Sequence, residues 1–454
     1  MGMGMGHWQT EQQQEFWIAT VELSQTPRHV FYERVNELLA EAGFDAWLEQ
    51  LCRPHYSQKG RGSIAPGRYF RMLMVGYFEE IDSQRGIAWR CSDSLSLKSF
   101  LGCQPHEATP EHSSLTRITS RLPLEIYREV FAFVLQLVHE HGLLKGKTLG
   151  VDSTTLEANA AMKSIVRKDS GDDWESHLKK LAAAEGIEIS SRADAARFDK
   201  QRAKTGKKKC SNDDWQSPSD PEARITKMKD GSTHLAYKAE NAVDLDTGAI
   251  TAAEIYHADQ ADSATLEDTL TLATGQIAEV AGEPLCHEVV ADKGYLKNET
   301  LPVISDIGTG LRTYISEPLV PQGRTWADKP AEQRDAFRAN HRRIRSERGK
   351  RLLRRRGEVV ERTFAHLCET GGRRRTWLRG LTKVTKRYQV LALSHNLGLI
   401  LRNLCGAAKP RAFTLVLSLY ASLLATRRNL RFVCQAQPAI PRPKLAFSQT
   451  TLAS

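Results

Sequence analysis

A ten-residue stretch, KTLGVDSTTL at positions 147–156, limits the possible folds of this chain more than any other segment. Its first half is largely apolar and β-prone, which predicts a buried strand. One carboxylate, Asp152, interrupts the apolar run, and polar residues follow it. Before this stretch, apolar residues such as Phe31, Val35 and Leu38 recur at helical spacing instead. The sequence therefore predicts an all-α region followed by an α/β region that begins at this strand.

The same helical spacing of apolar residues occurs throughout the first third of the chain. It predicts helices over residues 31–51, interrupted at Gly43, and over 66–80, 83–91, 97–101, 110–121 and 125–141. We expect Thr109 to cap the helix at 110–121, with Pro110 as its first residue. If this helix acts as the recognition helix of a helix-turn-helix motif, its polar residues would contact DNA. Their polarity is explained equally well if the segment is an ordinary surface helix. They are Ser113, Ser114, Arg117 and Arg121.

Beyond the first strand, the pattern predicts a mixed sheet with flanking helices. Two strands are expected on either side of a turn at 246–248, followed by a helix over 263–280 and a strand over 285–291. A helix from Asn298, a strand over 312–316, a basic loop, and helices over 358–369 and 383–403 complete the series. Such alternation after a hairpin is typical of an α/β domain. Residues 163–230 are dense in charge, including the basic run 204–209, and predict a partly helical, partly mobile insertion.

Charge and cysteine usage narrow the class of protein. Lys and Arg number 64 against 54 Asp and Glu, which gives a net charge of +10 and favours a polyanionic partner. The excess is concentrated at residues 338–356, where ten Lys or Arg residues accompany a single acid, Glu347. The eight cysteines form no Cys-x-x-Cys pair, so neither a zinc site nor a disulfide framework is expected. The N-terminus lacks an apolar signal segment, and the apolar run at 413–425 is too short to span a bilayer, which predicts a cytoplasmic protein.

Three carboxylates are the candidate catalytic and metal-binding residues. Asp152 and Asp292 stand at the ends of predicted strands, and groups at strand ends of an open sheet converge on a common crevice. Glu361 flanks the apolar stripe of a late helix and would complete the set. Carboxylate oxygens suit Mg²⁺, and two such ions align an attacking oxygen with a leaving oxygen at a phosphodiester. Taken singly, each residue also fits a turn cap or a solvated helix position.

Four motifs in this order resemble those of bacterial insertion-sequence transposases of the DDE type. They are GVDSTTLEANAAM around Asp152, THLAYKAENAVDLDTGAI in the hairpin, VVADKGY around Asp292 and GEVVERTFAHL around Glu361. The N-terminal stretches IAPGRYFRMLMVGYFEEIDSQRGIAWR and TPEHSSLTRITSRL resemble the helical domain that precedes the catalytic domain in this family. The resemblance extends from about residue 16 to 403.

The resemblance implies an α/β catalytic domain with a ribonuclease-H-like mixed sheet, preceded by an all-α N-terminal domain. It divides the chain into a flexible N-terminus (1–15), a helical domain with a role in DNA binding (16–145), a catalytic domain with its insertion (146–405, insertion about 163–230) and a tail (406–454). It also implies that Asp152, Asp292 and Glu361 bind two Mg²⁺ ions, with Mn²⁺ as an alternative. The family pattern of Tyr and Arg before the glutamate and Lys after it is absent, since Arg354, Gly357 and Cys368 occupy those positions.

The implied activity is metal-dependent cleavage and joining of DNA strands by a nucleoid-associated bacterial enzyme. Its partners would be the terminal inverted repeats, the target DNA and, in the active complex, a second copy of the chain. The dense basic residues around Glu361 would bind DNA phosphates: Arg342, Arg343, Arg345, Arg348, Lys350, Arg351, Arg354, Arg355, Arg356, Arg362, Arg373, Arg374 and Arg375. Two alternatives remain open, a structure-specific nuclease of the same fold and a non-catalytic DNA-binding protein from a decayed element.

Overall fold

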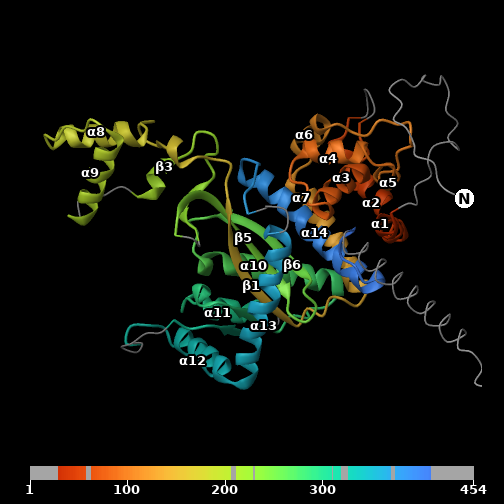
Figure 1. Ribbon diagram of the computed structural model, residues 1–454. Helices are drawn as coiled ribbons and strands as arrows, with labels where there is room; N and C mark the ends of the chain where they lie inside the picture. Colours follow the sequence, from red (N-terminus) through yellow and green to blue (C-terminus); the bar gives the residue numbers. More distant parts are fainter. Residues whose placement is uncertain are drawn as a thin grey trace, which may run out of the picture.

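A helical N-terminal region and a mixed α/β region make up the computed structural model, which describes residues 29–57, 63–205, 211–228, 231–308, 310–318, 326–369 and 374–410. Figure 1 shows the helices α1 to α7 gathered on one side of the central sheet, and the long helix α14 running between the two regions. The predicted fold class of an α/β region preceded by helices is confirmed at this level. Among the described helices, none is long and apolar enough to cross a membrane.

The N-terminal region follows the helical pattern of the sequence closely. Gly43 separates the first two helices in a left-handed conformation (φ 67°), which glycine adopts without strain. The expected cap at Thr109 is wrong: the helix begins at His112, and its N-cap is Glu111. The helices are α1 (Val30–Glu41), α2 (Phe44–Cys52), α3 (Pro66–Phe78), α4 (Gln84–Ser92), α5 (Leu95–Phe100), α6 (His112–Arg121) and α7 (Leu124–Glu140), with a short 3₁₀ turn at Arg53–His55.

Within the described residues, six strands form the central sheet. Strands β4 and β6 both pair with β5, one after the other along its outer edge. On the other side of β5 follow β1, β7 and β8, in that order. Strand β1 is antiparallel to β5 and parallel to β7, and β8 is parallel to β7, so the sheet is mixed as predicted. The strands are β1 (Thr148–Glu157), β4 (Arg224–Lys227), β5 (Thr233–Asp244), β6 (Ile250–His257), β7 (Glu288–Ala291) and β8 (Arg312–Ile315).

Helices cover both faces of this sheet. Glu240 of β5 contacts Thr265 and Thr269 of α10, whereas the neighbouring Asn241 contacts Tyr388 of α14, so the two helices lie on opposite faces. Helix α13 crosses β1 on the face of α14. The helices are α10 (Asp262–Ala281), α11 (Thr300–Asp306), α12 (Ala331–Arg345), α13 (Glu347–Phe364) and α14 (Leu381–Cys405), with short turns at Lys293–Tyr295 (η4) and Ala365–Glu369.

The basic segment before Glu361 differs from its prediction. We expected a loop up to residue 357, but the segment forms most of α12 and α13, with a break only at Ser346. Arg, Lys, Leu and Glu are good helix formers, and the Ser346 hydroxyl accepts the N–H of Gly349 as an N-cap. The charge density that suggested a loop is therefore compatible with a helix, because most of the charged side chains project from its exposed faces.

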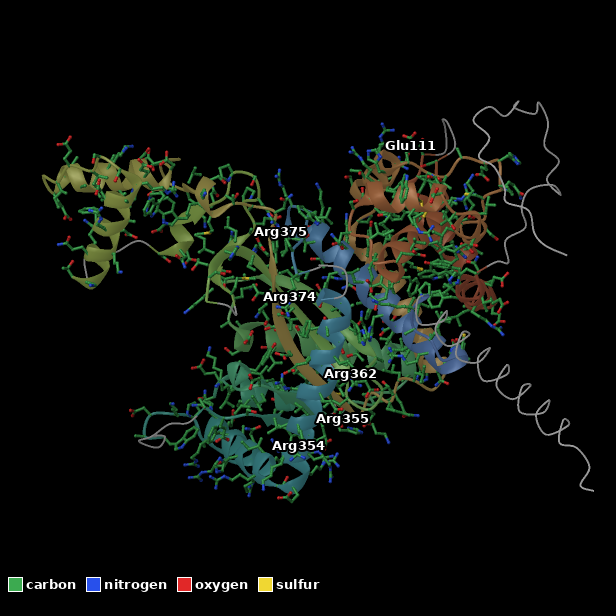
Figure 2. All side chains as sticks on the ribbon, viewed as in Figure 1. Glu111, Arg354, Arg355, Arg362, Arg374 and Arg375 are labelled. Atoms are coloured by element: carbon green, nitrogen blue, oxygen red, sulfur yellow. The ribbon has the colours of Figure 1, made fainter. Side chains whose placement is uncertain are left out.

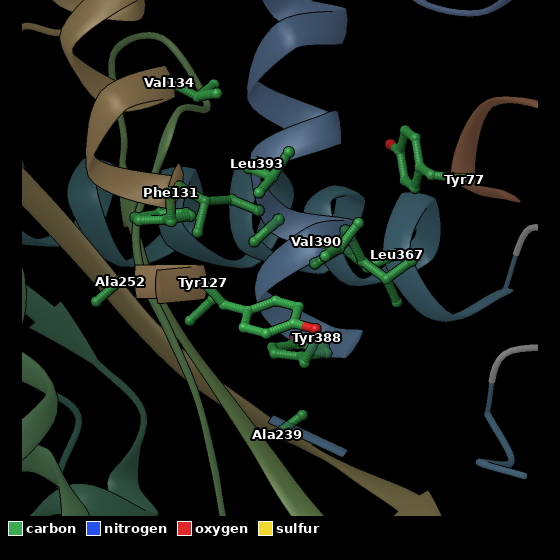
Figure 3. Packing of buried hydrophobic residues seen from close by; sticks show 14 of the residues in the cluster. Tyr77, Tyr127, Phe131, Val134, Ala239, Ala252, Leu367, Tyr388, Val390 and Leu393 are labelled. Carbon is green, nitrogen blue, oxygen red and sulfur yellow. The ribbon is translucent and has the colours of Figure 1, made fainter. Parts of the chain in front are cut away.

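One continuous apolar core joins the helical region to the sheet. Figure 3 shows Tyr127 and Phe131 of α7 beside Val390 and Leu393 of α14, with Ala239 and Ala252 of the sheet nearby. These side chains are all buried and belong to the same packed cluster. Burial of this kind contributes about 1.5–3 kcal/mol for each large apolar side chain. Helix α14 therefore fixes the position of the sheet relative to the N-terminal helices.

The charged segment after β1 contains a small helical unit. Helices α8 (Trp174–Ala184) and α9 (Arg192–Lys204) enclose a separate cluster of buried residues that includes Leu178 and Phe198. Short strands β2 (Val166–Arg167) and β3 (Trp215–Gln216) pair at its base, flanked by 3₁₀ turns at Met162–Ser164 and Asn212–Asp214. Figure 1 shows α8 and α9 extending away from the sheet. The expected helical content is present, although β4 at 224–227 already belongs to the sheet.

Candidate active site

Asp152 lies in the middle of β1, on the face covered by α13. Its Oδ1 accepts the N–H of Ser153 at 2.9 Å, and its Oδ2 lies 2.9 Å from Nη1 of Arg356 in α13. Burial raises the pKa of Asp152, whereas Arg356 and the Ser153 N–H lower it, and the net result is a pKa above the usual value. The negative charge of Asp292 contributes to this increase. Asp152 is thus a half-buried carboxylate that needs a nearby cation.

Asp292 occupies the equivalent place on the adjacent strand. Gly150 of β1 pairs with Val290 of β7 in parallel register, so Asp152 and Asp292 each stand two residues further along neighbouring strands. Asp292 is half-buried, and its side chain has no hydrogen bond or ion pair within the described residues. The structure therefore brings together the two aspartates that the sequence placed at strand ends.

Glu361 lies on the helix that crosses these strands, but it does not join the aspartates. Val360 anchors α13 over β1, because a Cβ at Gly150 would stand only 2.9 Å from Val360 Cγ2. The Glu361 side chain is exposed, and its Oε1 lies over Gly357, 3.9 Å from where a Cβ would be. In the described part of the chain, no three Asp, Glu, His or Cys side chains are close enough to bind one metal ion.

The donor set of the two aspartates fits a divalent cation. Carboxylate oxygens are the preferred ligands of Mg²⁺, and Asp292 offers a carboxylate with no competing partner among the residues described. At Asp152 the guanidinium of Arg356, only 12% exposed, supplies the compensating positive charge. Binding of a cation to Asp152 would require this pair to open, and a change of side-chain conformation would be needed to bring Glu361 to the aspartates.

A buried polar network supports the site from the opposite face of the sheet. Ser153 donates to Asp262 at 3.0 Å, and Lys238 lies 3.4 Å from the same carboxylate. Glu240, fully buried, accepts hydrogen bonds from Thr265, Thr269 and Tyr295. Tyr295 ends η4, the short turn that begins directly after Asp292.

This network was not predicted from the sequence. A signal was present, because Lys238 and Glu240 are charged residues at alternate positions in the largely apolar middle of the strand, and a buried charge of that kind needs partners. The pairing of Arg356 with Asp152 was not predicted either, because nothing in the sequence distinguishes Arg356 from the other residues of the basic segment.

The predicted DNA-binding arginines and lysine fall into two groups. Several are engaged in the fold: Arg343 donates to Thr313, Arg348 to Glu288, Arg355 to the Leu245 carbonyl, Lys350 to Glu347 and Arg362 to Glu358. Figure 2 shows Arg354, Arg355 and Arg362 along α13, with Arg374 and Arg375 beyond its C-terminal end. Four form no ion pair or hydrogen bond through their side chains within the described residues: Arg342, Arg345, Arg351 and Arg354. Arg373 lies outside the described residues.

The tentative contact residues of the N-terminal region all lie on α6. Ser113 and Ser114 are half-buried, whereas Arg117 and Arg121 are exposed. The Arg121 guanidinium stacks over the Tyr56 ring at 5.1 Å and lies 3.4 Å from the Ser63 hydroxyl. An exposed basic edge on this helix is compatible with either interpretation of the segment.

Two segments of the chain match known protein families. Residues 21–121 match the Transposase domain (DUF772), and residues 321–401, which include Glu361, match the Transposase DDE domain. Neither the curated proteins nor the solved structures contain a match. The two transposase domain matches, in this order along the chain, confirm the resemblance to insertion-sequence DDE transposases that the sequence motifs indicate.

Proposed function

We propose that the protein binds the ends of an insertion sequence and catalyses metal-dependent cleavage and transfer of DNA strands. One observation carries the proposal: Asp152 and Asp292 stand at corresponding positions of neighbouring parallel strands, close enough that the negative charge of Asp292 helps to raise the pKa of Asp152. A transposase domain match covers the helix that crosses these strands and carries Glu361. Asp152, Asp292 and Glu361 are the proposed catalytic, metal-binding residues.

The topology supports a ribonuclease-H-like fold for the catalytic region. Strands β6, β5 and β1 form an antiparallel meander, and β7 and β8 extend the sheet parallel to β1 through helical crossovers. This arrangement places the middle of the first strand beside the end of the fourth main strand. It therefore explains how residues 140 positions apart in the sequence form one site.

The proposed reaction is hydrolysis of a phosphodiester followed by transesterification. Water forms a bond to phosphorus while the bond to the 3′-oxygen breaks, and this oxygen leaves as a 3′-hydroxyl. That hydroxyl then attacks a phosphodiester of the target and displaces its 3′-oxygen, so neither step needs a covalent enzyme intermediate. Two Mg²⁺ ions, or Mn²⁺ ions, would activate the attacking oxygen and stabilise the leaving oxygen. Asp152 and Asp292 would hold them, and Glu361 would complete the ligand set once its side chain reorients.

The proposed partners are double-stranded DNA at the terminal inverted repeats and at the target. Exposed basic residues of α12 and α13, together with Arg374 and Arg375, would bind phosphates. Arg117 and Arg121 of α6, which are also exposed, would contribute further phosphate contacts. Two ends must be paired for transposition, so a homodimer is the proposed active assembly.

The decisive experiment replaces each proposed ligand by its amide. We expect Asp152→Asn, Asp292→Asn and Glu361→Gln to abolish Mg²⁺-dependent cleavage, because an amide does not bind a hard divalent cation as a carboxylate does. DNA binding should persist in all three variants. Asp268→Asn, an exposed acid on α10, is the matched control and should cleave like the unaltered protein. Retained cleavage by Asp292→Asn would overturn the assignment.

The same assay distinguishes the alternatives. A structure-specific nuclease would cleave but give no joined product from precleaved ends. A non-catalytic DNA-binding protein would retain DNA in a salt-sensitive manner and show no metal-dependent nicking. Two observations are also expected of a non-catalytic protein, so the assay has to test this alternative. Asp152 is paired with Arg356, and Glu361 lies apart from the two aspartates.

A further inference from the structure

A basic hollow lies at the other end of the parallel strands, away from Asp152 and Asp292. It has a volume of about 600 Å³ and contains five cationic side chains from three parts of the chain. Lys147 directly precedes β1, Arg312 begins β8, and the remaining three project from α13. These three are Arg348, Arg351 and Arg355.

The two acidic residues that line the hollow do not neutralise its five positive charges. Its two acidic residues are Asp246 and Glu288. Glu288 is 4% exposed and fully engaged, because it accepts hydrogen bonds from Arg348 at 2.6 and 3.2 Å and from Thr148 at 3.0 Å. Burial raises the pKa of Glu288, but these hydrogen bonds outweigh it and hold the pKa below its usual value, so the carboxylate is ionised and fixes Arg348 in place. The cations therefore remain in excess.

The arrangement of the cations in the hollow suits a ligand with several anionic oxygens. Arg355 donates to the Leu245 carbonyl at 3.1 Å, so both it and Arg348 are held in position by the fold. Lys147, Arg312 and Arg351 are exposed, and within the described residues their side chains form no hydrogen bond or ion pair. Fixed guanidinium groups beside free ones favour phosphate oxygens, because less side-chain freedom is lost on binding.

We propose that this hollow binds backbone phosphates of DNA at a distance from the phosphodiester held by the carboxylates. The inference rests on the proposed function and adds a second contact point to it. Along β7, four residues separate Glu288 from Asp292, about 13 Å. Along α13, thirteen residues separate Arg348 from Glu361, about 20 Å. At 3.4 Å per base pair, the hollow takes phosphates about four to six base pairs from the reacting one.

The test measures DNA binding in EDTA, where no cleavage occurs. The variant Arg312→Gln/Arg351→Gln removes two exposed cations whose side chains form no hydrogen bond or ion pair within the described residues. The control with the same change in charge is Arg197→Gln/Lys200→Gln on α9. The probe is a 30-base-pair duplex of mixed sequence, titrated at several salt concentrations. Each phosphate contact contributes about 0.9 to the salt slope, so the hollow variant should lose nearly 2 and the control nothing.

A second measurement identifies the residues directly. The duplex should protect Arg312 and Arg351, but not Arg197, from modification by p-hydroxyphenylglyoxal, followed by mass spectrometry. Equal salt slopes in both variants, or equal modification of Arg312 and Arg351 with and without DNA, would overturn the inference. Failure of the proposed function gives a different result, namely normal protection of the hollow in a protein that never cleaves DNA with Mg²⁺.

Discussion

Two glycines of α13 illustrate how much a single residue constrains the site helix. Gly349 lies in the corner between α12 and α13, where a Cβ would stand 2.1 Å from the Arg343 carbonyl oxygen and 2.8 Å from Ile344 Cα. Gly357, one turn before Glu361, has open space, with only Glu361 Oε1 at 3.9 Å. The two positions are in the same helix, so the same substitution should have opposite effects.

We predict that Gly349→Ala lowers the free energy of unfolding by about 3 kcal/mol, because the neighbouring backbone must move. Gly357→Ala should raise it by about 0.5–1 kcal/mol, because alanine loses less conformational entropy in a helix. Denaturant unfolding of both variants beside the unaltered protein measures the difference. A neutral Gly349→Ala would show that the corner between α12 and α13 is looser than described.

At the scale of elements, the hydrogen bonds of Glu240 connect α10, β5 and the turn after Asp292. Three donors, Thr265, Thr269 and Tyr295, converge on this carboxylate, and Glu240→Gln would offer them a single acceptor oxygen in place of two. We expect the turn carrying Asp292 to loosen, which lowers the cleavage rate at saturating Mg²⁺ by about tenfold or more and raises the Mg²⁺ concentration for half-maximal rate.

Two measurements separate this positioning role from general destabilisation. DNA affinity in EDTA should be unchanged in Glu240→Gln, and Tyr295→Phe, which removes one of the three hydrogen bonds, should show a smaller shift of the same kind in Mg²⁺ dependence. If cleavage falls without any change in Mg²⁺ dependence, the network supports the fold alone.

His395 of α14 provides a prediction for pH. It is buried against the β5–β6 turn, with Nε2 3.4 Å from the Gly248 carbonyl, and burial lowers its pKa to about 3. In the unfolded chain its pKa is about 6.5, so below that pH the unfolded state binds more protons and stability falls. Between pH 6.5 and 5.5 the loss from this residue should be about 1 kcal/mol.

Denaturant unfolding at the two pH values provides the measurement. His395→Gln should unfold with a smaller difference between pH 6.5 and 5.5, whatever its stability at either pH. His106→Gln, at an exposed position, should retain the difference of the unaltered protein. An identical pH dependence in all three proteins would contradict the burial of His395 as a neutral ring.

Elements with strong periodicity were predicted from sequence, and those decided by tertiary partners were not. The hairpin β5–β6 and helices α10 and α14 were predicted within a few residues, because each has a clear apolar pattern. The basic helices α12 and α13 were missed in part, because few apolar residues mark their buried faces. Asp152 and Asp292 were found through their strand ends, whereas the partners of Arg356 and Glu240 come from distant parts of the chain and were not predicted.

On the scale of the whole molecule, the unit of α8 and α9 is separable from the rest. Its buried residues form a cluster of their own, and at its base β2 pairs with β3 in a two-stranded sheet separate from the central one. At that base, the N–H of Lys168 donates to the Asp214 carbonyl at 2.9 Å, so the two chain segments already lie at the spacing of a β-hairpin. The continuous core shared by the helical region and the sheet is built mainly from other elements, although Trp174 of α8 packs against it as well as against the small cluster.

We therefore predict that replacing residues 169–213 by Asn-Gly yields a folded protein. Asn-Gly favours the two-residue turn that continues the twist of paired strands. The thermal midpoint should stay within about 5 °C of that of the full chain, because the large core keeps nearly all of its residues and loses only peripheral contacts such as those of Trp174 and of His177 with Trp215. The matched comparison is Leu397→Ala in α14, a fully buried position of the shared core, which should lower the midpoint more than the excision does. Aggregation of the shortened chain, or a larger loss than that of Leu397→Ala, would mean that the unit is needed to hold the sheet together.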